Sequence, residues 1–100
     1  MNNSNIKIIC PVCGIEGAVE YLPWENGLTP SQDTCPCCGT HYGEDDWGET
    51  KEEINKNHIK LRKKWIQSGM KWCSKYDLPL ENWNPKDQLK NLENNGISQN

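Results

Sequence analysis

Four cysteines occur in two short segments of the same pattern, and their spacing is typical of a metal site. Residues 10–14 read CPVCG and residues 35–39 read CPCCG, so both match Cys-Pro-x-Cys-Gly, which we call a CPxCG knuckle. Two residues between the cysteines let a tight turn direct both sulfur atoms at one ion, and two knuckles supply four tetrahedral ligands. The sequence therefore predicts one structural Zn²⁺ held by Cys10, Cys13, Cys35 and Cys38.

The surroundings of the knuckles favour a metal over disulfide bonds. Gly14 and Gly39 permit a positive φ, which leaves backbone N–H groups free to point at the thiolates. Residues 14–34, twenty-one in number, separate Cys13 from Cys35 and could form a hairpin. A Cys-x-x-Cys disulfide would close a strained small ring, and the chain starts without a secretory signal pattern. We therefore expect metal ligands and free thiols in a reducing, cytoplasmic setting.

The composition allows only a small apolar core. Hydrophobic residues make up 34% of the 100 residues, Phe is absent, and five Trp carry most of the aromatic mass. A structural ion should then supply much of the folding free energy, on the order of 10 kcal/mol for such sites. We expect one domain over residues 6–95, with disordered ends at 1–5 and 96–100. No membrane span is expected, because no stretch approaches the roughly 18 apolar residues that a span requires.

The net charge of −3 conceals two segments of opposite charge. Residues 1–50 carry eight acidic residues against one Lys, a net charge of −7, and residues 51–75 carry eight Lys or Arg against two Glu, a net charge of +6. The acidic half ends in a turn that we interpret as a surface for a basic protein partner. Its residues are Glu44, Asp45, Asp46 and Trp47. The alternative nucleic-acid contacts lie in the basic segment. They are Lys56, Lys60, Lys63 and Lys64.

Three short strands are expected to carry the two knuckles. The patterns predict strands over residues 6–9, 18–22 and 40–43. Residues 23–27 are typical of a turn, and residues 28–34 of a loop. The predicted fold class is small α+β: a three-stranded zinc ribbon followed by an amphipathic helix, a Trp-rich segment and a short C-terminal helix.

The first helix has recognisable ends and one apolar stripe. Thr50 and Glu53 have the spacing of a capping box, which starts a helix near Lys51, and Gly69 is placed to end it after Ser68. Within it, four residues recur at spacings of four, three and four. They are Ile54, His58, Leu61 and Trp65. We expect this helix to lie across the ribbon.

The second helix is predicted over residues 85–94. Asn84 is a favourable N-cap, and Pro85 suits the first helical position. Leu89 and Leu92 should then face inward. Between the helices lies the Trp-rich segment, and we expect three tryptophans to form a joint core. They are Trp65, Trp72 and Trp83.

The other candidate ligands have simpler interpretations. Four cysteines already saturate a tetrahedral ion, so His41 and His58 are not expected to bind it, and His58 should be a hydrogen-bonded core histidine. Cys37 should lie on an exposed turn, where we interpret it as inert or able to exchange with a ligand. Cys73 is expected to be a buried small apolar residue.

The knuckle region resembles a known group of proteins. The Cys-Pro-x-Cys-Gly pair, with Cys-Pro-Cys-Cys as its second unit and the run YGEDD at residues 42–46, is similar to cysteine-rich bacterial zinc-ribbon proteins marked by a Cys-Pro-Cys-Cys motif. That unit usually comes first in those chains and is second here. The resemblance covers roughly residues 6–48, and residues 65–85 resemble the tails of small uncharacterised bacterial proteins. It implies a zinc ribbon without established enzyme activity and, for some relatives, a toxin-neutralising or other interaction role.

Nothing in the sequence indicates catalysis. There is no Gly-rich phosphate loop after a strand, no Gly-x-Ser-x-Gly, and no nucleophile paired with a base at recognisable spacing. We therefore expect no enzyme activity and no small-molecule substrate, but a module that binds a protein with a basic surface, as an immunity-type or inhibitor protein does. One alternative is a nucleic-acid-binding regulator using residues 51–75. Another is thiol redox chemistry through Cys37 or a rubredoxin-like role; rubredoxin shares the knuckles but has a longer segment between them.

Overall fold

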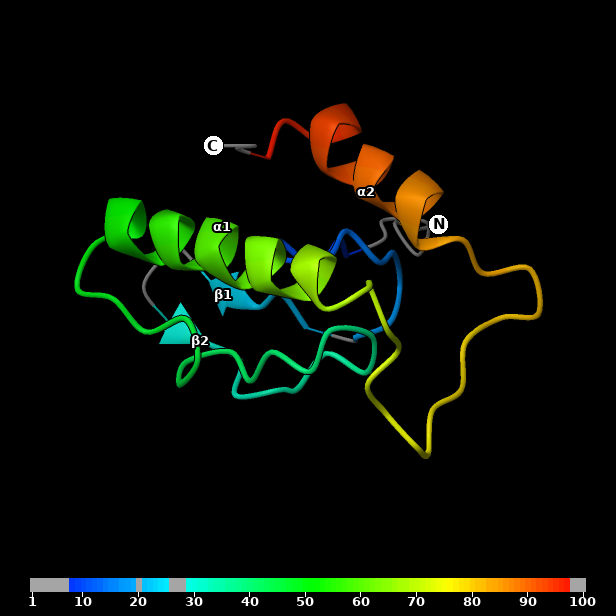
Figure 1. The fold of residues 1–100 in the computed structure, drawn as a ribbon. Coiled ribbons are helices and arrows are strands. Elements are labelled where there is room, and N and C mark those ends of the chain that lie inside the picture. Colours follow the sequence, from blue (N-terminus) through cyan, green and yellow to red (C-terminus); the bar gives the residue numbers. More distant parts are fainter. Residues whose placement is uncertain (1–7, 20, 26–28, 98–100) are drawn as a thin grey trace, which may run out of the picture.

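The computed structural model describes residues 8–19, 21–25 and 29–97. Its regular elements are two helices, α1 (Lys51–Gln67) and α2 (Pro85–Asn94), and a small antiparallel sheet of β1 (Trp24–Glu25) and β2 (Thr29–Pro30). In the sheet, Trp24 lies opposite Pro30. After α1 the chain makes a wide excursion before it returns to α2 (Figure 1). The structure is thus mixed, but most of the described part outside the helices is turn and irregular chain.

Both helices form where the sequence predicts them. At the start of α1, the Thr50 hydroxyl accepts a hydrogen bond of 3.1 Å from the Glu53 N–H, as in a capping box, while the Glu53 carboxylate accepts from the N–H of Glu49. The helix ends one residue earlier than predicted, with Ser68 as its C-cap. For α2, the Asn84 side chain accepts from two backbone N–H groups of the first turn. The predicted helices are therefore confirmed to within one residue.

The predicted three-stranded ribbon is not present among the described residues. Residues 6, 7 and 20 of the expected strands lie outside the described part. The first and third of these strands are reduced to isolated bridges, Ile9 with Glu16 and Thr34 with His41. The described residues of the second, 18, 19, 21 and 22, form neither a strand nor a bridge. The two-residue strands β1 and β2 form instead, where we expected a turn and a loop. Pro30 has no N–H that could donate to a neighbouring strand. It can take part because β2 is an edge strand, where that donor is not needed.

The core is built around the knuckles. Seven residues form its buried cluster: Cys10, Val12, Cys13, Cys35, Cys37, Tyr42 and Trp65. Trp72 and Trp83 are half-buried, pack against this cluster, and meet edge to face with ring centroids 5.3 Å apart. The expected joint tryptophan core is thus present, with Trp65 as its most buried member. Among the described residues, neither helix is both long and apolar enough to cross a membrane.

Candidate metal centre

The four predicted ligand cysteines converge on one point. The sulfur atoms of Cys10 and Cys38 are 3.8 Å apart, and so are those of Cys13 and Cys35; all four lie within 4.8 Å of one another. A regular tetrahedron with Zn–S bonds of about 2.3 Å has edges of about 3.8 Å. All six cysteines of the chain are free thiols. The arrangement therefore fits a single tetrahedral metal ion.

The two knuckles have the same hydrogen-bond pattern, which explains why both aim their sulfur atoms alike. The N–H of Gly14 donates to the carbonyl of Cys10 at 2.9 Å, and the N–H of Gly39 donates to that of Cys35 at 2.8 Å. Both glycines have positive φ, 85° and 78°. Each is also pressed against another segment: a Cβ on Gly14 would lie 2.6 Å from the Gln88 carbonyl oxygen. Glycine is required there on both counts.

A buried cysteine sulfur atom needs either a proton or a metal ion to neutralise its negative charge. Burial raises the pKa of the Cys13 thiol, and hydrogen bonding to Cys10 raises that of Cys38. A bound metal ion takes the place of the thiol protons and stabilises the thiolates. When bound, Zn²⁺ would supply a cross-link between the two knuckles.

Two hydroxyl groups are placed to support thiolates. The Thr40 hydroxyl lies 3.2 Å from the Cys38 sulfur atom, where it can donate a hydrogen bond. Tyr42 is fully buried, and its hydroxyl has no hydrogen-bond partner among the described residues. Burial raises the pKa of Tyr42, and the neighbouring thiolates of Cys10 and Cys35 raise it further, so the phenol stays neutral. A neutral donor beside sulfur atoms, without another acceptor, fits a metal-bound thiolate cluster.

Tyr42→Phe should therefore weaken metal binding without abolishing the fold. The buried hydroxyl has no hydrogen-bond partner among the described residues, and we expect it to donate to the neighbouring Cys10 sulfur atom once that atom is a metal-bound thiolate. Such outer contacts typically change metal affinity by 10- to 100-fold, so removing the hydroxyl should cost about tenfold. The measurement is zinc transfer to a chromophoric chelator of known affinity. Tyr21→Phe is the matched control, because Tyr21 is exposed. Equal zinc affinities for the two variants would contradict this role of Tyr42.

Arg62 connects α1 to the first knuckle. Its Nε donates to the carbonyl of Val12 at 3.0 Å and its Nη2 to that of Pro11 at 2.7 Å, with the side chain buried. Burial lowers the pKa of the guanidinium, while the negative charges of Cys10 and Cys13 act to raise it. The buried cation thus partly offsets the charge of the thiolate cluster.

Arg62→Met should destabilise the protein by about 3–6 kcal/mol. The substitution keeps most of the apolar stem but leaves two backbone carbonyls without their charged donor, and such hydrogen bonds contribute about 1.5–3 kcal/mol each. The free energy of unfolding in urea measures this effect. Lys63→Met is the control, since Lys63 is exposed on the same helix. A similar stability of both variants would show that Arg62 does not hold the knuckle.

Helix α2 contacts the same knuckle from another direction. The Gln88 amide donates to the carbonyl of Cys13 at 3.0 Å and to the Cys37 sulfur atom at 3.4 Å. The Asn91 amide donates to the carbonyl of Gly14 at 2.9 Å. The first knuckle is therefore held by side chains from both helices, and its ligands have fixed positions.

The predicted environments of Cys37 and Cys73 are wrong, because each lies in the environment that we expected for the other. Cys37 is fully buried and accepts the Gln88 hydrogen bond, so it does not lie on an exposed turn. Cys73 is exposed, although its backbone N–H donates to the carbonyl of Cys37 at 2.9 Å. The physical reason is that residues 73 and 74 pair with the outside of the second knuckle, while α2 covers Cys37.

Asp46 does not belong to the exposed acidic turn. It is fully buried and accepts hydrogen bonds from Trp24 (2.7 Å), from His58 (2.6 Å) and from the Gly43 N–H (2.7 Å). Burial alone would raise the pKa of Asp46, but these donors outweigh burial and lower it. His58 is the hydrogen-bonded core histidine that was predicted. This group of side chains fastens the turn to α1.

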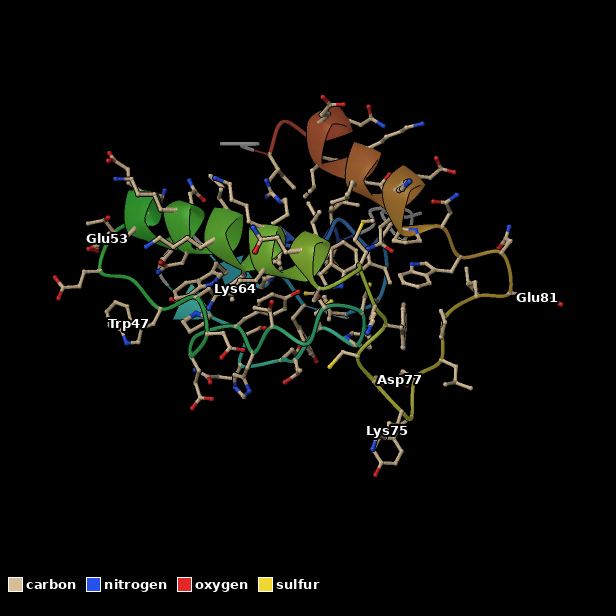
Figure 2. All side chains as sticks on the ribbon, in the orientation of Figure 1. Trp47, Glu53, Lys64, Lys75, Asp77 and Glu81 are labelled. Carbon is tan, nitrogen blue, oxygen red and sulfur yellow. The ribbon has the colours of Figure 1, made fainter. Side chains whose placement is uncertain are left out.

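The other predicted contact residues are at the surface. Glu44, Asp45 and Trp47 are exposed, with Trp47 at 58%. Trp47 lies on the turn near the start of α1, on the same side as Glu53 (Figure 2). The turn is held there because the Asn57 amide donates to the Trp47 carbonyl at 2.7 Å.

The four lysines of the alternative site are exposed along α1. Among the described residues none of them forms an ion pair. Lys56 and Lys60 line a hollow of about 380 Å³ together with Trp47 and Glu53. Trp47 of the predicted partner surface and two lysines of the predicted basic surface therefore border the same hollow.

Sequence reasoning missed five side chains of the site. Arg62 had been counted only as one of the eight Lys and Arg of residues 51–75, and four other residues had been given no role in the site. These are Thr40, Tyr42, Gln88 and Asn91. The partners of Arg62, Gln88 and Asn91 are far away in the chain: Gln88 contacts Cys13 across 75 positions. The position of Arg62 between His58 and Trp65 on the apolar stripe was the only available signal.

Two relatives of the chain come from Bacillus subtilis. No family model and no solved structure matches the chain. The chain is 29% identical to the uncharacterized protein YoaQ of Bacillus subtilis (strain 168) over 80 residues, which cover 72% of this chain and 68% of YoaQ. It is 31% identical to the uncharacterized protein YozI of the same strain over 81 residues, which cover 72% of this chain and 67% of YozI. The chain therefore belongs to the family of YozI.

Proposed function

We propose that this protein is a non-enzymatic module in which one structural Zn²⁺ joins two knuckles, as in a zinc ribbon, and whose surface binds a protein partner. The observation that carries the structural role is the burial of the sulfur cluster: Cys10, Cys13 and Cys35 are at most 1% exposed. Four thiolates around a tetrahedral ion leave no position for water or substrate. Such an ion supports folding rather than catalysis.

The turn that carries Glu44, Asp45 and Trp47 is the proposed contact surface. Buried Asp46 fixes this turn from below, so little conformational entropy would be lost on binding. An exposed Trp beside carboxylates suits a basic partner, because aromatic side chains provide binding energy and charges provide orientation and speed of association. In this proposal the protein binds the basic surface of its partner, as an immunity-type or inhibitor protein binds a nucleic-acid-binding protein.

Capture of a partner from the source cell tests this proposal. The bait is the zinc-loaded protein, compared with Glu44→Lys and Trp47→Ala, and the matched controls are Glu93→Lys and Tyr21→Ala, which alter exposed residues elsewhere. We expect one protein that is retained after nuclease treatment and lost only with the first two variants. Retention by all four variants would contradict the proposed surface.

The exposed lysines of α1 favour one second candidate, a nucleic-acid-binding regulator. Lys56, Lys60, Lys63 and Lys64 are spaced so that they share one side of the helix. Phosphate contacts would make binding fall steeply with salt concentration. Recovery that is sensitive to nuclease, together with a steep salt dependence lost in Lys60→Gln, would support this second function over the first.

A further inference from the structure

We infer that a groove beside α2 is a second docking site, and that it takes a partner polypeptide segment in which a basic side chain is flanked by apolar ones. The groove encloses about 730 Å³. It is lined by residues 15–18, which follow the first knuckle, by residues of the excursion between the helices, and by residues of α2. It is separate from the turn at Trp47, since none of its lining residues belongs to that turn. The inference shares with the proposed function only the assumption that the partner is a protein. We call this hollow the Trp groove.

The apolar part of the Trp groove is unusually open to solvent. Trp72 and Trp83 line it with their edge-to-face pair, and each indole N–H is already bonded, to the carbonyl of Asp77 and to the Gln88 side chain. Leu78 and Leu80 also line the groove and are 74% and 80% exposed. The fixed indoles present apolar ring surface rather than free donors. Apolar side chains exposed to this extent around a hollow are typical of an interaction site.

The charged side chains that line the Trp groove are all acidic. Glu16, Asp77 and Asp87 line it, and none of its described lining residues is Lys or Arg. Asp87 makes an exposed ion pair with Lys90 at 3.4 Å, which contributes little and can be exchanged. Asp77 lies on the excursion that extends away from the helices (Figure 2). The charge of the groove therefore complements a Lys or Arg side chain, which the indole faces would also attract.

These features favour a peptide segment over other occupants. Asp77, Leu78 and Leu80 line the groove from one short irregular segment, so one acidic and two apolar contacts lie within four residues. A basic side chain with apolar neighbours would match both. A second copy of this protein is the competing occupant, because its own α1 carries both lysines and apolar residues.

The test uses three synthetic nine-residue peptides and the zinc-loaded protein. The first peptide alternates Leu and Arg in a Gly/Ser frame, the second replaces Arg with Glu, and the third replaces Leu with Ser. Binding is followed by two-dimensional NMR of the backbone and indole N–H groups. We expect saturable binding of the first peptide only, with shifts at the indoles of Trp72 and Trp83 and not at that of Trp47.

Variants of exposed residues locate the site without disturbing the fold. Leu80→Ser removes apolar surface and should weaken binding by about tenfold, and Asp77→Asn by a few fold with a reduced salt dependence. Leu22→Ser and Glu93→Gln are the matched controls, because both residues are exposed outside the groove. The turn variant Glu44→Lys should leave peptide binding unchanged, which separates this inference from the proposed function.

Four results would overturn the inference. The first is equal binding of the Arg and Glu peptides, and the second is equal affinity of Leu80→Ser and Leu22→Ser. The third is a dimer in sedimentation equilibrium that Leu80→Ser dissociates, which would make a second copy the occupant. Absence of binding by the Leu–Arg peptide to the folded, zinc-loaded protein would also contradict it.

Discussion

Replacing Cys38 by serine should leave the protein unfolded at ordinary zinc concentrations. Structural zinc sites of this type contribute about 10–16 kcal/mol in small domains, more than the whole stability of a typical domain. Here the knuckle cysteines themselves make up much of the buried core, so losing one ligand removes both the cross-link and the centre of packing. Far-ultraviolet circular dichroism and a thermal melt should show no cooperative transition.

Cys73→Ser is the matched control for this result. Cys73 is exposed and is not one of the four clustered cysteines, so its thiol should matter little for folding. We expect the melting temperature and the zinc content of this variant to equal those of the unaltered protein. A folded Cys38→Ser protein with the same melting temperature would show that the fold does not depend on the metal.

Trp65→Ala should cost about 3–5 kcal/mol of stability in the zinc-loaded protein. Trp65 is 7% exposed, belongs to the buried cluster, and donates its indole N–H to the Lys71 carbonyl at 3.0 Å. Truncating a buried Trp removes its burial free energy, leaves a cavity, and here frees a carbonyl as well. Urea unfolding with zinc in excess is the measurement.

The control for Trp65 is another tryptophan of the same chain. Trp47→Ala removes an equal number of atoms from an exposed position and should change the free energy of unfolding by less than about 0.5 kcal/mol. If the two variants were equally stable, α1 would not pack on the knuckles through its apolar stripe.

The features that the sequence predicted well are those that short-range rules determine. The ligand cysteines could be predicted because a Cys-x-x-Cys-Gly segment closes its own turn, as the Gly14 to Cys10 and Gly39 to Cys35 hydrogen bonds show. The starts of the helices could be predicted because Thr50 and Asn84 bond N–H groups two or three positions away. Each of these decisions involves a few neighbouring residues.

The missing three-stranded ribbon and the burial of Asp46 could not be predicted from short-range rules. The strand patterns around the knuckles were too short to specify pairing, since the knuckle turns use the adjacent N–H and carbonyl groups: Cys10 bonds Ile15 and Cys35 bonds Thr40. Asp46 appeared to be one more acidic residue of an exposed turn. Its burial is favourable because Trp24, Gly43 and His58 all donate to its carboxylate. No local pattern encodes the approach of Trp24 and His58, which lie 22 and 12 positions away.

Zinc-edge X-ray absorption of the purified protein, combined with its metal content, tests the central claim most directly. We predict one zinc per chain with four sulfur ligands at about 2.3 Å and no nitrogen or oxygen ligand. The same spectrum should be obtained from Cys73→Ser, whose four clustered cysteines are intact. A site with a bound water or histidine, two ions per chain, or a folded protein without metal would contradict the account.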